Sequence, residues 1–367
     1  MDISNTTVKS PMIFAAIEKK VVSTIPMLTQ DEVRGKEYIS YGDNNLYPQY
    51  LYDLNQSVAT LKTITEGTAS FVAGDDAACN VKGFEVTMNR KGDTIRNMIR
   101  WIAKDYMLYG GFCLNVIRNH NNNVAEVFYT DFRDVRSDKD NEVFYYSKDW
   151  DKKYVRSTKV LVYPKFISGA DAPSSMMYVK NDVNNTYPIP RWSGAIKSCE
   201  VERKLDDLDL NSLENGFFGS YLINFLNGVP TDDQKAEIEE NVVSKFCSAD
   251  NAGRILINFA NGEENAAKVE KLEVPDWGDK FKSVADRSRE QIYCAFGAVP
   301  QLFGNMMAST GFNEVEFKTA WDLYSRTIVR DIQRVIGDAF DHIFGMKNSI
   351  TIKPFSINDN NNEQTVS

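Results

Sequence analysis

The fold of this chain is decided by the segment FGAVPQLFGNMMASTGFN, which spans residues 296–313. All its residues from 297 to 313 are uncharged, and its glycines and proline are typical of a loop. A helix is predicted directly after it, because Asn313 and Glu316 have the spacing of a capping box and apolar residues then recur every three or four positions. These residues are Phe317, Trp321, Tyr324, Ile328, Ile332, Val335, Ala339 and Ile343. The pattern predicts a helix over residues 313–344, ended by Gly345 and about 45–50 Å long.

Two further helices are predicted before this segment, with a small insertion between them. Helical periodicity covers residues 193–219 and 276–296. The intervening residues 220–275 have the signals of a small α/β module, namely strands at 221–226, 254–259 and 268–274 and a helix capped by Thr231 or Asp232 that runs to Phe246. The pattern predicts that this module lies between two helices that can run side by side.

The part of the chain before residue 193 has the mixed pattern of an α+β domain. Helices are predicted at 46–54, 58–72 and 94–108, and strands at 112–117, 125–129, 142–147 and 155–163, with a last strand near the C-terminus at 350–353. Residues 1–40 are irregular and polar and are expected to form an N-terminal arm. Residues 356–367 are expected to form a mobile C-terminal tail.

Composition and charge limit the classes of function. The chain has 367 residues, of which 43% are hydrophobic, and a formal net charge of -9 with a pI of about 5.0. Such an acidic chain is not expected to be attracted as a whole to nucleic acid. Its five cysteines are far apart and form no C-x-x-C pair, which favours reduced thiols in the cytosol. There is no basic leader and no run of ~20 apolar residues, so a soluble protein without a membrane span is expected.

Motifs for enzymatic chemistry are missing from the sequence. It has no phosphate-binding loop, no H-E-x-x-H, no G-x-S-x-G and no dinucleotide-binding glycine pattern. The histidines, His120 and His342, have no second ligand at metal spacing. The sequence therefore predicts no enzymatic activity, no metal and no cofactor. One alternative is a hydrolase in which Asp206, Asp207 and Asp209 supply paired carboxylates, although adjacent acids on one helix splay to different faces.

The order of these elements resembles the portal proteins of tailed bacteriophages in the HK97-like group. The resemblance is carried by four short motifs: residues 109–114 (YGGFCL), 215–218 (NGFF), 231–234 (TDDQ) and 296–304 (FGAVPQLFG). It covers the chain from about Tyr41 to Phe355. The sequence differs from larger portals because it ends soon after the last helix and strand. A helical crown is therefore expected to be reduced or absent.

The resemblance implies an α+β subunit with a wing, a two-helix stem, a clip and a tunnel loop. The wing would comprise residues 41–192 together with the long helix and final strand at 313–355. The stem would comprise 193–219 and 276–296, the clip 220–275 and the tunnel loop 297–312. Tunnel-loop residues expected to line a DNA channel are Gly304, Asn305, Met306, Met307, Ala308, Ser309, Thr310 and Gly311. Stem residues expected to face the channel or a neighbouring subunit are Glu202, Asp206, Asp209, Lys280, Lys282, Arg287 and Arg289.

The resemblance also implies a function and partners. It implies a homo-oligomeric ring, most often a dodecamer, at one capsid vertex of the virion, through which double-stranded DNA passes during packaging, retention and ejection. The implied partners are the terminase, a head-tail adaptor and the major capsid protein, with assembly in the host cytoplasm and no membrane. A different phage head-tail ring or connector component without enzymatic activity is the alternative.

Overall fold

The computed structural model describes residues 25–26, 28–32, 37–150, 160–214, 221–225, 231, 255–259, 277–304 and 314–355. The first three helices are α1 (Tyr47–Ser57), α2 (Ala59–Ala73) and α3 (Ile95–Tyr109). Their ends follow from local chemistry: α1 has a proline in its first turn, Thr94 caps α3 by accepting from the Asn97 N–H, and α3 ends at Gly110 in the left-handed conformation. All three helices predicted for this part of the chain are confirmed, with ends shifted by one to three residues.

Short antiparallel sheets complete the body. Strands β2 (Gly111–Arg118), β3 (Val124–Thr130) and β7 (Ser174–Lys180) form a sheet in the order β3-β2-β7. A second sheet contains β4 (Val135–Ser137), β5 (Val143–Tyr146) and β6 (Leu161–Pro164), and a third pairs β1 (Asp76–Cys79) with β10 (Ile350–Lys353). The sequence predicted β2, β3, β5 and β10 and missed β1, β4 and β7. The strand predicted at 155–163 begins only at Leu161 within the described residues, because residues 151–159 lie outside them.

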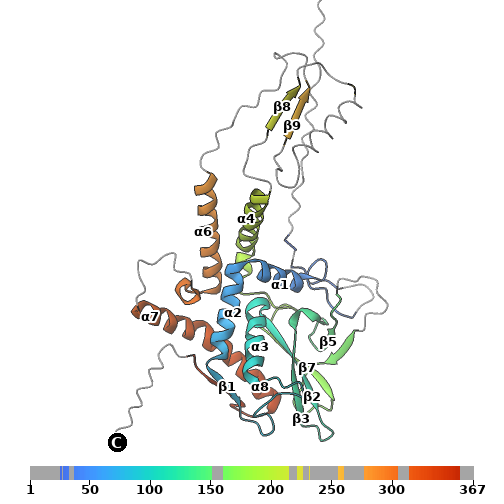
Figure 1. Ribbon diagram of the computed structural model, residues 1–367. Coiled ribbons are helices and arrows are strands. Elements are labelled where there is room, and N and C mark those ends of the chain that lie inside the picture. The colour runs from blue at the N-terminus through green and yellow to red at the C-terminus, as the bar shows by residue number, and fades with distance from the viewer. Residues whose placement is uncertain are drawn as a thin grey trace, which may run out of the picture.

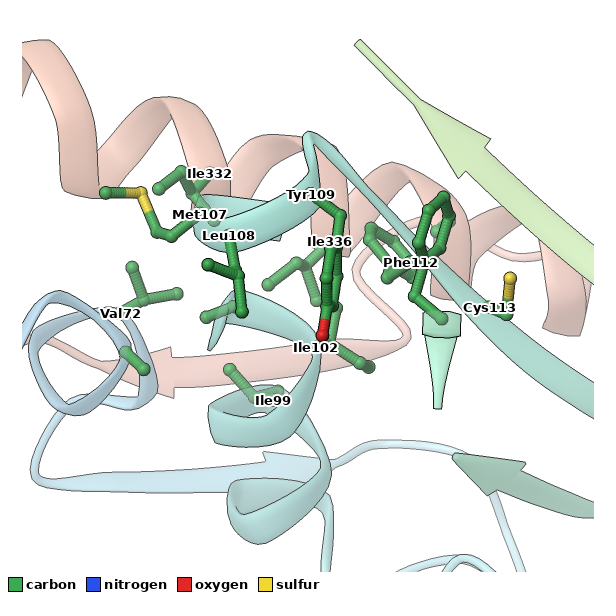
Figure 2. Close-up of a cluster of buried hydrophobic side chains, with 14 of the residues drawn as sticks. Val72, Ile99, Ile102, Met107, Leu108, Tyr109, Phe112, Cys113, Ile332 and Ile336 are labelled. Carbon is green, nitrogen blue, oxygen red and sulfur yellow. The ribbon is translucent and has the colours of Figure 1, made fainter. Parts of the chain in front are cut away.

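The core of the body lies where α2, α3, β2 and α8 (Arg330–Phe344) meet. Figure 2 shows their side chains converging; the labelled ones are Val72, Ile99, Ile102, Met107, Leu108, Tyr109, Phe112, Cys113, Ile332 and Ile336, and all are buried. Burial of each large apolar side chain stabilises the fold by roughly 1.5–3 kcal/mol. The C-terminal helix is therefore an integral part of the domain built by residues 41–192.

The helix predicted at 313–344 is confirmed as a continuous helical run, but it contains a wide turn. It consists of α7 (Glu314–Tyr324), a π-helical turn at Ser325–Val329, and α8. The buried residues of this run recur at the three- and four-residue spacing of one helix face: Tyr324, Ser325, Ile328, Val329, Ile332, Ile336, Ala339, Phe340 and Ile343. Gly345, in the left-handed conformation, ends the helix as predicted.

Part of the segment expected to be an arm is attached to the body. The Ile39 N–H donates to the Ser137 carbonyl at 2.9 Å, and the Gln30 side chain both donates to and accepts from the Tyr187 backbone. Leu28 also packs against the core. These contacts tie the described residues between 25 and 40 to β4 and to Tyr187. Residues 1–24 lie outside the described residues.

Two helices project from the body (Figure 1). A short 3-10 turn at Ser193–Ala195 leads into α4 (Ile196–Glu214), and α6 (Trp277–Phe296) returns beside it. Beyond them, β8 (Tyr221–Phe225) and β9 (Ile255–Phe259) pair in parallel, which requires a crossover between them. The helix predicted from Thr231 or Asp232 to Phe246 and the strand at 268–274 lie outside the described residues.

The expectations of free thiols and of no membrane span can be compared with the described part of the chain. Cys79, Cys113 and Cys199 are free and buried, and Cys294 is free and exposed. None of the helices in this part is both long and apolar enough to cross a bilayer. Within it, no three His, Cys, Asp or Glu side chains gather as metal ligands would.

Candidate functional site

The base of α4 is fixed to the body by buried polar contacts. Glu200 accepts hydrogen bonds from the Tyr50 hydroxyl and from Arg203, both at 2.7 Å. Glu202 accepts from the Thr60 hydroxyl at 2.8 Å and is 5% exposed. In the single subunit α4 turns this carboxylate toward Thr60 of α2, and a channel or subunit contact of Glu202 stays a prediction. The helix periodicity alone did not reveal which face α1 and α2 would cover.

The two projecting helices are joined to each other and to the core at their lower ends. The Ser198 hydroxyl donates to the Gln291 side-chain oxygen at 2.6 Å. The Trp192 ring stacks on Phe296 with centroids 6.0 Å apart, and its indole N–H donates to the Leu108 carbonyl at 3.1 Å. Since Trp192, Ser198 and Phe296 are buried, the start of α4 and the end of α6 form one unit with the body.

The outer part of α4 is exposed. Asp206 and Asp209 are exposed and have no ion pair among the described residues, and the neighbouring Leu208 and Leu210 are 42% and 57% exposed. Asp207 is paired weakly with Lys204 on the same helix, at 3.7 Å. The paired-carboxylate alternative requires facing acids in an enclosed site, whereas these three aspartates are exposed on one helix. This arrangement favours a contact surface over a catalytic centre.

Basic residues in the outer half of α6 lie at the same distance from the body as acidic residues of α4. Lys280, Lys282 and Arg287 are exposed, and Arg289 is paired with Asp286 at 3.8 Å. Because α4 and α6 run in opposite directions, residues equally far from the Ser198–Gln291 bond lie at the same level; Asp209 and Lys280 are each eleven residues away. Acidic and basic positions thus occupy the same level of the projection. Their pairing between subunits stays a prediction.

The loop segment begins at an aromatic cluster. Phe303, in the 3-10 turn Pro300–Phe303, lies between Phe71 of α2 and Tyr324 of α7, with ring centroids 5.8 and 5.6 Å away. Tyr324 is fixed by a 2.6 Å hydrogen bond between its hydroxyl and Thr68. Gly67 leaves room for Phe303, since a Cβ there would lie 2.8 Å from the ring. The turn before the loop is therefore held by α2 and α7.

The residues predicted to line a channel can be located only in part. Gly304 is exposed and ends the 3-10 turn in the left-handed conformation. Asn305, Met306, Met307, Ala308, Ser309, Thr310 and Gly311 lie outside the described residues. Sequence reasoning missed Phe71 and Thr68 as supports of this segment. The clustering of aromatic residues at 296, 303, 321 and 324 was the available signal.

A buried carboxyl group with a raised pKa, that of Asp105, lies away from this site. Burial raises the pKa of Asp105 well above its ordinary value, and the nearby Asp131 carboxylate raises it further. Asp105 accepts from the Tyr129 hydroxyl at 2.9 Å and from the Phe132 N–H at 3.2 Å. At 5% exposure it joins α3 to β3 inside the body. Its role is structural.

Comparison with known proteins gives a result at the level of structure only. No family model and no curated protein matches the sequence. Among solved structures, a chain in the neck of a native gene transfer agent (GTA) particle, computed with C12 symmetry, has 17% identity, 84% coverage of each chain and a TM-score of 0.52. A chain in the native GTA virion has 16% identity, 83% coverage of each chain and a TM-score of 0.51.

The similar structures also include an HK97 family phage portal protein from Corynebacterium diphtheriae. It has 11% identity and a TM-score of 0.48, and the similarity covers 82% of this chain and 93% of that chain. At identities of this size the similarity establishes architecture: this chain has the mixed helix-and-sheet fold of chains found in the neck and virion of GTA particles.

Proposed function

We propose that this chain is a non-enzymatic, phage portal-type subunit that forms a ring and conducts double-stranded DNA. The observation that carries the proposal is the combination of an α+β body with a projecting antiparallel helix pair, in a fold shared with a chain of a particle neck computed with C12 symmetry. In this proposal the ring sits at one capsid vertex. It serves genome packaging, retention and ejection and is a platform for tail attachment.

The charges of the projecting helix pair, α4 and α6, fit a ring in which every pair of neighbouring subunits makes the same contact. Cyclic symmetry rotates subunits without moving them along the axis, so residues at the same level meet in neighbouring subunits. Asp206 and Asp209 of one subunit would thus lie near Lys282 and Lys280 of the next, whereas Arg287 and Arg289 lie nearer the body. Exposed pairs of this kind contribute only about 0.2–1 kcal/mol each, but a ring repeats them at every interface.

The composition of the loop fits passage of DNA without binding. The segment from Gly297 to Asn313 has no charged residue. Basic side chains there would bind phosphates and release counterions, and this affinity would oppose sliding. The proposed tunnel-loop residues Gly304 to Gly311 would therefore form a constriction that contacts DNA without ion pairs and without reading its sequence.

The partners follow from this place in a particle. The proposed ring is a dodecamer in the virion, assembled in the host cytoplasm. It would contact the terminase and then a head-tail adaptor through the clip at 220–275, and the major capsid protein around the wing.

Ring formation is the first test of this function. The purified full chain should form closed rings in negative-stain micrographs, and native mass spectrometry should give one dominant oligomer of about twelve subunits, as symmetric closure favours a single copy number. A chain that stays monomeric over a range of protein and salt concentrations would contradict the proposal. A ring that assembles but does not support DNA packaging would favour the alternative, a head-tail connector of similar build.

A second test concerns the loop. Replacing both Met306 and Met307 with Asp should leave the ring intact and reduce DNA packaging at least tenfold, because negative charges at a constriction repel phosphates. The readout is protection of packaged DNA from nuclease. The matched control replaces Leu323 and Met346 with Asp, since both are exposed apolar residues elsewhere. Packaging equal to that of the control would contradict the placement of these methionines in the channel.

A further inference from the structure

The charges of this acidic chain are distributed unevenly. The whole chain has 42 basic and 51 acidic residues, but the segment from 82 to 104 has six basic and two acidic ones. This segment contains the turn before α3 and most of α3 itself. A local excess of positive charge can attract an anionic partner even where the net charge of the molecule is negative.

Five of these basic residues precede α3 or lie in its first two turns; we name them the α3 basic surface: Lys82, Arg90, Lys91, Arg96 and Arg100. All five are exposed. Arg96 and Arg100 lie one turn apart on the same side of α3, about 6 Å along its axis. Lys91 and Arg90 lie over the Phe128 ring of β3, at 5.4 and 5.8 Å from its centroid. The ring holds these cations at the edge of the sheet.

Four of the five charges, those of Lys82, Lys91, Arg96 and Arg100, have no acidic partner among the described residues. Arg90 is paired with Glu126 at 3.7 Å, and Arg96 donates to the Gly74 carbonyl at 3.1 Å. Within the described part of the chain, the side chains of Lys82 and Arg100 form no hydrogen bond or ion pair, and the Lys91 ammonium contacts an aromatic face.

The two acidic residues of this segment, Glu85 and Asp93, accept hydrogen bonds from neighbouring neutral groups. Glu85 accepts from the Gly83 N–H at 2.8 Å and Asp93 accepts from the Asn89 side chain at 2.9 Å. These hydrogen bonds come from neutral groups and leave both carboxylates charged, so the segment from 82 to 104, with six basic and two acidic residues, keeps a net charge of +4.

The surface lies at the end of the body opposite the projection. In Figure 1, β1 and the N-terminal end of α3 lie low in the view, whereas α4 and α6 rise from the other end. In the proposed ring, on which this step rests, cyclic symmetry would repeat the surface around the axis on the face opposite the stem. A repeated set of cations on one face fits an extended polyanion better than a small ligand.

We propose that the α3 basic surface binds the phosphate backbone of double-stranded DNA without reading its sequence. Duplex DNA has one negative charge per about 1.7 Å of its axis, so several cations spread over one surface can each neutralise a phosphate. Long Lys and Arg side chains in a turn and on the exposed face of α3 suit backbone contacts. The proposed channel loop is uncharged, so this surface is where the chain holds DNA, and the loop is where DNA slides.

The test compares salt dependence in full-length variants. Binding of a short fluorescein-labelled duplex is measured by anisotropy from about 50 to about 200 mM salt, where the slope of log affinity against log salt counts the neutralised phosphates. The variant Lys82→Gln, Lys91→Gln, Arg100→Gln should lose about 3 units of slope, and Lys82→Gln and Arg100→Gln alone about 0.9 each. The control Lys139→Gln, Lys148→Gln, Lys165→Gln has the same net charge and alters exposed lysines near β4–β6. It should retain the wild-type slope.

The outcomes separate this inference from the proposed function. An unchanged slope in the triple variant, or equal loss in the control, would overturn the DNA surface while rings seen in the same samples would leave the portal proposal standing. Loss of slope in a chain that never forms rings would support the surface and contradict the portal proposal. Displacement of the duplex by an acidic peptide at equal charge concentration would overturn the assignment to DNA. If the triple variant fails to fold, the two single variants decide.

Discussion

Replacing Arg136 with Met is expected to lower the free energy of unfolding by about 3–5 kcal/mol, because it leaves buried acceptors without donors. Arg136 is fully buried. Its guanidinium donates to Asn45 at the side-chain and backbone oxygens, at 2.7 and 2.5 Å, and to the Arg133 and Val135 carbonyls at 2.8 Å each. It also lies 4.8 Å from the centroid of the Trp150 ring.

These bonds matter beyond the β4 strand that contains Arg136. Asn45 directly precedes α1, and Tyr50 of α1 donates to Glu200 at the base of α4. Loss of Arg136 should therefore loosen the start of α1 and, through it, the seat of the projecting helix. The structure assigns to this arginine the connection between β4 and the helix layer.

Urea unfolding followed by tryptophan fluorescence measures the effect. The control is Arg100→Met, an exposed arginine whose side chain has no partner among the described residues, and it should change stability by at most about 0.5 kcal/mol. Arg136→Lys should fall between the two, because one ammonium cannot serve acceptors on several sides. An Arg136→Met chain as stable as the control would show that the buried acceptors find other donors.

The second large effect is expected at Gly74, where Ala should destabilise the chain by about 3–5 kcal/mol through backbone strain and steric overlap. Gly74 ends α2 with φ of 67° and ψ of -169°. A Cβ at this position would lie 2.0 Å from the Lys353 carbonyl oxygen. That oxygen accepts the Asp75 N–H at 3.1 Å, so relief of the overlap would separate β1 from β10.

Gly92→Ala is the matched control because it isolates the strain. Gly92 also has a positive φ, of 85°, but a Cβ there would have nothing within 4 Å. The difference in thermal unfolding midpoint between the two variants measures the overlap with Lys353. Equal midpoints would mean that β10 moves aside at little cost in free energy.

The sequence predicted elements whose signal is local. The three helices before residue 110 and the helical run from 314 to 344 have long periodic patterns and clear caps, as Thr94 and Gly345 illustrate. Strands β2 and β3 were predicted because apolar residues surround an asparagine-rich turn that includes Asn122, which has a positive φ.

What the sequence missed depends on distant partners. Strand β7 contains Ser174, Ser175 and Met176, which have low strand propensity, and it forms because β2 supplies a partner along its whole length. Strand β1 has the sequence DAAC, without a β-branched or aromatic residue, and β4 has only three residues. The burial of Glu202 likewise depends on Thr60, which lies 142 residues earlier in the chain.

The pairing of β1 with β10 has a consequence for how the protein is made. The strand at Asp76–Cys79 leaves the ribosome well before its partner at Ile350–Lys353. The core positions that α8 covers, including Val72 and Ile102, remain open until α8 has also been synthesised. Chains interrupted before residue 330 would expose that apolar surface and be available to chaperones and proteases. A chain truncated before α8 therefore cannot complete the core of the body.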